Sequence, residues 1–134
     1  MKILATKIHT LLAADVSVVA IVADRIYRQR APNSPTYPYV VFSKVVSVGQ
    51  QTHDDGQGLD RTDIQFDCYA QVDTDADDLR AAVRASLMAR DPDTGLGPIA
   101  GVKVQNPIER DIDETAVNKF NFQLDLTFWH NQSA

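Results

Sequence analysis

The chain has 134 residues, of which 44% are hydrophobic and 23% are charged, a composition typical of a single globular domain spanning residues 1–134. Its formal net charge of −5 predicts an acidic surface, which argues against tight sequence-specific binding to nucleic acid. The single cysteine, Cys68, rules out an internal disulfide, and the absence of a long apolar stretch argues against a membrane span.

The first part of the chain predicts helices. Apolar residues three and four positions apart indicate an amphipathic helix over residues 1–14. Asp15 or Ser17 then caps a short second helix, because both side chains can accept a hydrogen bond from the first helical turn. A short strand at Ile26 and Tyr27 follows.

Two long strands are expected in the middle of the chain. The first starts at Tyr39 and runs to about Val48, with apolar residues on both faces of its first half. Residues 49–58 contain no apolar side chain and predict a loop or a hairpin arm. From Leu59 to Val72, apolar and polar residues alternate, which is typical of a strand with one buried face.

The last part predicts one helix and two strands. Aspartates open a helix at residue 73, and a short strand at residues 102–104 is followed by a polar connection over residues 107–118. The final strand, residues 120–129, alternates without a break between apolar and mainly polar residues. These elements predict the α+β class, a mainly antiparallel sheet of about four to five strands with two main helices packed on one face.

The sequence offers no plausible catalytic, cofactor-binding or metal site. Asp93-Thr94-Gly95 matches the signature triplet of aspartic proteases, but the flanking prolines and glycines favour a turn. The spaced aspartates from residue 73 onward lack the glycine and glutamate of a calcium loop. The three histidines are too scattered to form a metal pair. We therefore expect no enzyme activity and no cofactor.

Two aromatic residues lie on the outward phase of the long strands. Tyr69 and Trp129 share this phase, and Tyr39 and Val41 are expected nearby. They form either a subunit contact or an incidental exposed pair.

The order of motifs resembles the tail-completion family of long-tailed bacteriophages and prophages (domain-of-unknown-function family 3168), which is related to the lambda-type tail terminators. The resemblance covers nearly the whole chain and rests on an ordered series of short motifs with matching gaps. These motifs are Leu11-Leu12-Ala13-Ala14-Asp15, Asp24-Arg25-Ile26-Tyr27, Arg30-Ala31-Pro32, Tyr37-Pro38-Tyr39-Val40-Val41-Phe42, Ile64-Gln65-Phe66-Asp67-Cys68-Tyr69, Ala81-Ala82-Val83-Arg84 and Leu124-Asp125-Leu126-Thr127-Phe128-Trp129-His130.

The resemblance implies a structural subunit that forms a ring, commonly a hexamer, at the junction of tail and neck in the virion, after assembly in the host cytoplasm. Its partners would be further copies of itself, the tail tube protein and a head-completion or connector protein, while DNA passes through without specific binding. The candidate contacts with the tube or a neighbouring subunit are Gln50, Gln51, Thr52, His53, Asp54 and Asp55.

The acidic composition suits a ring lumen that DNA must pass without sticking. Asp63, Asp67 and Asp125, on the outward phase of their strands, are the candidate lumen residues. Two other functions remain open at this point: a head-tail connector or neck protein, and, from a different class, a hydrolase that uses Asp93.

Overall fold

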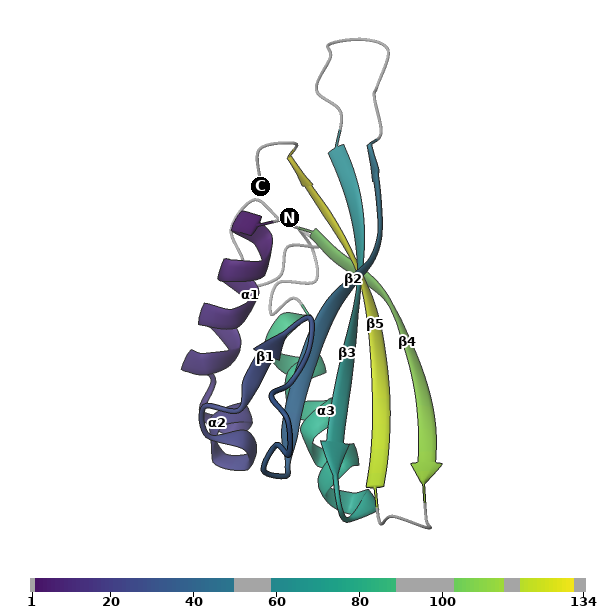
Figure 1. Cartoon of the computed structure of the whole chain (residues 1–134). Coiled ribbons are helices and arrows are strands. Elements are labelled where there is room, and N and C mark those ends of the chain that lie inside the picture. Colours follow the sequence, from purple (N-terminus) through teal and green to yellow (C-terminus); the bar gives the residue numbers. More distant parts are fainter. Residues whose placement is uncertain (1, 50–58, 89–102, 115–118, 132–134) are drawn as a thin grey trace, which may run out of the picture.

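The computed structural model describes residues 2–49, 59–88, 103–114 and 119–131. These residues form three helices and five strands (Figure 1). In chain order they are α1 (Lys2–Ala14), α2 (Val16–Val22), β1 (Ile26–Arg28), β2 (Tyr39–Gly49), β3 (Leu59–Ala70), α3 (Asp73–Leu87), β4 (Lys103–Glu114) and β5 (Lys119–Asn131).

The strands form one sheet in the order β1-β2-β3-β5-β4. Only β1 and β2 pair in parallel, and the other three pairs are antiparallel. The predicted α+β class with a mainly antiparallel sheet is therefore confirmed.

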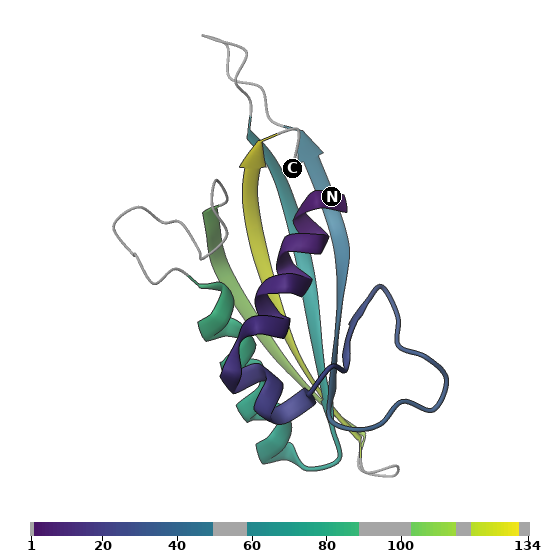
Figure 2. The same ribbon diagram turned by 90° about the vertical axis from the view of Figure 1, so that its left-hand side faces the viewer.

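All three helices lie on the same side of the sheet, in front of it in Figure 2. The chain bends by 83° between α1 and α2. Asp15 caps α2 at this bend, because its Oδ1 accepts hydrogen bonds from the backbone N–H groups of Ser17 (2.9 Å) and Val18 (3.1 Å). Among the described helices, none is long and apolar enough on its own to cross a membrane, although the bent pair α1–α2 passes that test when taken together.

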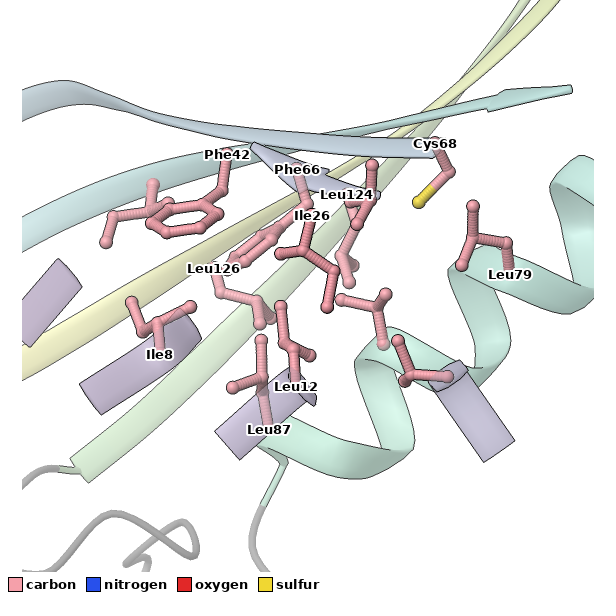
Figure 3. Packing of buried hydrophobic residues seen from close by; sticks show 14 of the residues in the cluster. Ile8, Leu12, Ile26, Phe42, Phe66, Cys68, Leu79, Leu87, Leu124 and Leu126 are labelled. Carbon is pink, nitrogen blue, oxygen red and sulfur yellow. The ribbon is translucent and has the colours of Figure 1, made fainter. Parts of the chain in front are cut away.

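The core lies between the helices and one face of β2, β3 and β5 (Figure 3). The inward residues of the alternating strands are buried, as the period-two pattern predicts, except for Phe120 at the start of β5, which is partly buried. Cys68 is among them, and burial raises the pKa of its thiol. The helices contribute Leu4, Ile8, Leu12, Val18, Val22, Leu79, Val83 and Leu87, and the strands contribute Ile26, Val40, Phe42, Ile64, Phe66, Cys68, Leu124, Leu126 and Phe128.

The sequence correctly predicts a strand at residues 103–104, but the polar connection expected from residue 107 is wrong as far as residue 114. In place of a short strand and a polar connection, β4 runs from Lys103 to Glu114 and pairs with β5 along its length. A register shift between Gln105 and Ile108 accommodates Pro107, which has no N–H to donate to the ladder. Ile108 and Ile112 of β4 lie on the outer face, while Glu109 and Asp111 lie on the helix side, so the apolar pattern does not mark a buried face.

Candidate functional site: the outer face of the sheet

No described helix covers the second face of the sheet, which we call the outer face. It carries the side chains that alternate with the core residues of β2, β3, β5 and β4. The register aligns Tyr39 with Tyr69 and Val41 with Asp67 across β2 and β3. The sequence therefore correctly predicts that Tyr39 and Val41 lie near Tyr69, whereas Trp129 pairs with Arg61, towards the other end of β3 from Tyr69.

A cluster of four tyrosines occupies the β1–β2 side of the outer face. The ring of Tyr39 stacks on that of Tyr69 with centroids 4.8 Å apart, and Tyr27 and Tyr37 contact Tyr39 at 6.1 and 5.2 Å. Tyr39 is only 5% exposed, and burial, followed by the neighbouring Tyr37 and Tyr69, raises the pKa of its hydroxyl. The apolar start of β2 is thus covered by aromatic rings of the same chain.

Lys119 completes this cluster, because its Nζ lies 4.9 Å from the centroid of the Tyr69 ring. Tyr69 is half-buried by contacts within its own chain. Its role in a subunit contact stays a prediction. For Trp129 the structure gives only the backbone, which pairs with Arg61 on β3 and with Lys103 on β4.

The three candidate lumen aspartates lie on the outer face, and two of them are paired with arginine. Asp63 accepts two hydrogen bonds from Arg61 at 3.1 and 3.0 Å, and a third from the Thr127 hydroxyl at 2.9 Å. Asp125 accepts one from Arg110 at 2.6 Å. These pairs neutralise much of the negative charge that Asp63 and Asp125 would present to a passing molecule.

Asp67 differs from the other two aspartates because its partners are neutral amides. Gln65 Nε2 donates to its carboxylate at 2.9 Å. Burial raises the pKa of Asp67, hydrogen bonds from Gln65, Asn121 and Gln123 oppose that rise, and the nearby charge of Asp125 adds to it. Asp67 is thus a partly desolvated charge without a cationic partner in the described part of the chain.

The raised pKa of Asp67 predicts a pH-dependent gain in stability for Asp67→Asn. Between the ordinary pKa of 3.8 and the raised native value, the folded chain binds more protons than the unfolded chain, so the charged carboxylate destabilises the fold increasingly as pH rises through this window. We expect the free energy of unfolding of the variant, relative to wild type, to be higher at pH 7 than at pH 3.5. Urea unfolding at both pH values measures this, and an equal difference at both would contradict it.

The β4 side of the outer face exposes apolar surface. The side chains of Ile108 and Ile112 are 55% and 39% exposed, and the register places them beside Asp125 and Asn121 of β5. One side-chain oxygen of each of these β5 residues is buried and accepts no hydrogen bond within the described chain. Exposed isoleucines next to unsatisfied acceptors are typical of a surface that a partner completes.

A second site, absent from the sequence-based predictions, lies on the helix side of β4. Arg80 of α3 is 7% exposed. Its guanidinium forms ion pairs with Asp111 and with Asp77 (3.2 Å), approaches Glu109 at 3.9 Å, and donates to the carbonyl of Arg110 at 3.3 Å.

The Arg80 guanidinium also lies 4.9 Å from the centroid of the Phe122 ring. Burial alone lowers the pKa of Arg80, but the carboxylates, Asp111 first, outweigh burial and raise it. Arg80 and Arg84 lie one helical turn apart on α3, and Glu109 and Asp111 lie on the same face of β4. These matching spacings of opposite charges are the signal by which the sequence could have predicted this site.

Several predicted residues lie outside the described part of the chain. They are the arm residues Gln50, Gln51, Thr52, His53, Asp54 and Asp55, and the triplet Asp93-Thr94-Gly95. Within the residues that are described, no group of three histidines, cysteines or carboxylates is placed to hold a metal ion.

The described residues form an α+β domain. Helices cover one side of its sheet, and a tyrosine-rich, half-polar surface lies on the other. A family model described as "Tail completion protein gp17" matches residues 6–128. The chain therefore belongs to this tail completion family, and the resemblance found in the sequence is confirmed. The protein is therefore a structural component of a phage-type tail. Its family consists of structural proteins and not of enzymes.

A solved structure has a similar fold. A chain from a structure titled "Virion of native gene transfer agent (GTA) particle" matches with a TM-score of 0.64 and 17% identity, over 92% of this chain and 91% of that chain. At this identity the match supports the fold and does not transfer individual residues. Among curated proteins, none matches the chain.

Proposed function

We propose that this protein assembles into a ring, most simply a hexamer, that caps the phage tail tube. The ring ends the polymerisation of the tube and offers its other surface to the head-completion or connector protein. The observation that carries the proposal is the tail completion family match over residues 6–128. The similarity to a chain of a phage-like virion particle supports it.

A tube stops growing when its last ring can accept no further ring. Each ring of a growing tube presents a surface that accepts the next ring, a head-to-tail contact that does not close along the axis. A capping ring must match that surface on one side and differ on the other. A stiff core with shaped outer surfaces meets this need, and the outer face with Ile108 and Ile112 provides one such surface.

Two features predicted from the sequence remain parts of this proposal. The segment 49–58 is the candidate contact with the tube or a neighbouring subunit. An acidic lumen would let DNA pass without adhering, and Asp67, which has no cationic partner in the described chain, would be its strongest contributor on the outer face.

Removal of the gene from its phage or prophage tests the proposal. We expect overlong tail tubes and separated heads and tails, because no ring would stop the tube or join the head. Electron microscopy of the lysate measures both. Tubes of normal length joined to heads would contradict the proposal.

Two further experiments separate the tail terminator from the connector and from the hydrolase. Purified protein mixed with purified tail tubes should form a cap at one end of the tube. A protein that instead binds only the portal side of heads is a connector and not a terminator. Complementation with Asp93→Asn should be normal, because a structural ring needs no catalytic carboxylate, whereas a hydrolase that uses Asp93 would lose its function.

A further inference from the structure

The two edges of the sheet carry charges of opposite sign. β1 and β4 are the edge strands, separated by three other strands, so they lie roughly 19 Å apart at the usual strand spacing. The β1 edge continues into the segment of residues 29–38, which projects away from the body on the side opposite α3 (dark blue in Figure 2). We call this segment, together with Arg28, the arginine loop.

The arginine loop presents unpaired positive charge. Arg28 and Arg30 are exposed, and neither has an ion pair with any residue that the structure describes. The loop also contains Pro32, Pro35 and Pro38, whose fixed φ angles reduce the conformational freedom that would be lost on binding. The two arginines thus lie at the base of a projecting segment that is stiffened by proline, and Arg28 borders a hollow against α1.

The opposite edge carries a groove between α3 and β4. Its volume is about 460 Å³, and its lining includes the small side chains of Ala81 and Ala85 together with Met88. Its lining bears two carboxylates, Asp77 and Glu109, and the two guanidinium groups of Arg80 and Arg84, while Asp111 lies beside the groove as an ion-pair partner of Arg80. The exposed Asp73 and Asp78 of the first turns of α3 add further negative charge nearby.

We propose that the arginine loop of one copy docks in the α3–β4 groove of the next copy. The two elements lie on opposite sides of one molecule, so their contact is head-to-tail and can close into a ring. The groove itself has balanced charge, but Asp73, Asp78 and Asp111 beside it make this edge net negative. The edge therefore complements the arginines of the loop and disfavours nucleic acid as the occupant of the groove. This proposal rests on the proposed ring function, and it names the surfaces through which neighbouring subunits touch.

Charge reversal tests the contact without substituting Arg80 or the residues that form ion pairs with it. Arg28→Glu together with Arg30→Glu changes only exposed side chains, and Ala81→Lys together with Ala85→Lys adds positive charge inside the groove. Each pair should raise the protein concentration needed to cap purified tail tubes by about tenfold or more, since like charges then face each other. Combining the two pairs should restore wild-type capping, because the charges are then exchanged.

A disulfide cross-link tests the geometry directly. In a chain carrying both Arg30→Cys and Ala81→Cys, oxidation on tail tubes should give a ladder of covalent oligomers, because each copy links to the next. Each single variant should stop at a dimer at most. The native Cys68 is buried and does not compete. The matched control replaces Arg30→Cys by Ala20→Cys, an exposed position on α2, and should give no ladder.

The outcomes separate this contact from the ring itself. A ladder, with rescue in the combined charge variant, supports the contact. Normal capping by both charge-reversed variants, or capping without a ladder, overturns the contact and leaves the ring function standing. Wild-type protein that fails to cap tubes overturns both.

Discussion

Replacing Phe66 by alanine is expected to lower the free energy of unfolding by about 3–5 kcal/mol. Phe66 is fully buried at the centre of the core, and its ring centroid lies 6.0 Å from that of Phe42 and 6.4 Å from that of Phe128 (Figure 3). The substitution removes these contacts and leaves a cavity that the surrounding strands can fill only in part. Since domains of this size are stable by about 5–15 kcal/mol, the loss is a large fraction of the total.

Thermal unfolding followed by circular dichroism measures this loss, and we expect the midpoint to fall by about 10–20 °C. Gln65→Ala is the matched control, because Gln65 is the preceding residue of β3 and points to the outer face. It gives up one hydrogen bond, to Asp67, and should cost about 1 kcal/mol or less. Equal losses for the two variants would mean that the alternation of β3 is assigned to the wrong faces.

Arg80→Met is expected to destabilise the protein by about 2–3 kcal/mol. The substitution keeps the apolar stem but removes the charge that holds Asp111, Glu109 and Asp77 beside α3. The cost stays below that of a fully buried ion pair, because the side chains of Asp111 and Glu109 are 57% and 40% exposed and are rehydrated in the variant. The docking of β4 against α3 should weaken most.

Urea unfolding and amide hydrogen exchange measure this effect, and protection in β4 should fall more than protection in β3. Arg84→Met is the matched control, because Arg84 lies one turn along the same helix and approaches the same Glu109 at 3.9 Å. Its side chain is 50% exposed, so its loss should cost well under 1 kcal/mol. If the two arginines proved equivalent, the network around Arg80 would not contribute as the geometry indicates.

The sequence predicted the elements whose own residues carry the signal. In β3 and β5, apolar and mainly polar residues alternate, and the fold buries the apolar series, including Phe66 and Leu124. Asp15 and Ser17 were the two predicted helix caps, and Asp15 takes this role, because its side chain acts within three residues. The motif order was also sufficient to recognise the tail completion family, which the family match confirms.

The sequence predicted only the start of β4 and not its length, because the signal beyond residue 104 is divided between distant segments. Ile108 and Ile112 look like inward residues of a weak strand, yet they lie on the outer face. The carboxylates on the helix side, Glu109 and Asp111, form ion pairs with Arg80, which is about thirty residues earlier in the chain. Hydrophobic periodicity contains no information about such a pairing, so residues 107–114 read as a polar connection.

In the candidate site too, the sequence predicted the local features but not the contacts between distant residues. The sequence placed Asp63, Asp67 and Asp125 on outward strand phases, and the register confirms that they share the outer face. Only the tertiary contacts show that Asp63 and Asp125 are paired with Arg61 and Arg110, whereas Asp67 has amide partners.

By itself, then, the sequence determined which residues form the helices and the alternating strands, because hydrophobic period and capping act over a few neighbouring positions. The tertiary structure alone decided which charges are neutralised and which surfaces remain for other copies. It also decided that β1 and β4 become the two edges, with the arginine loop at one and the α3–β4 groove at the other. The physical reason is that ion pairs and strand order join residues far apart in the chain, and their partners are known only once the backbone is folded.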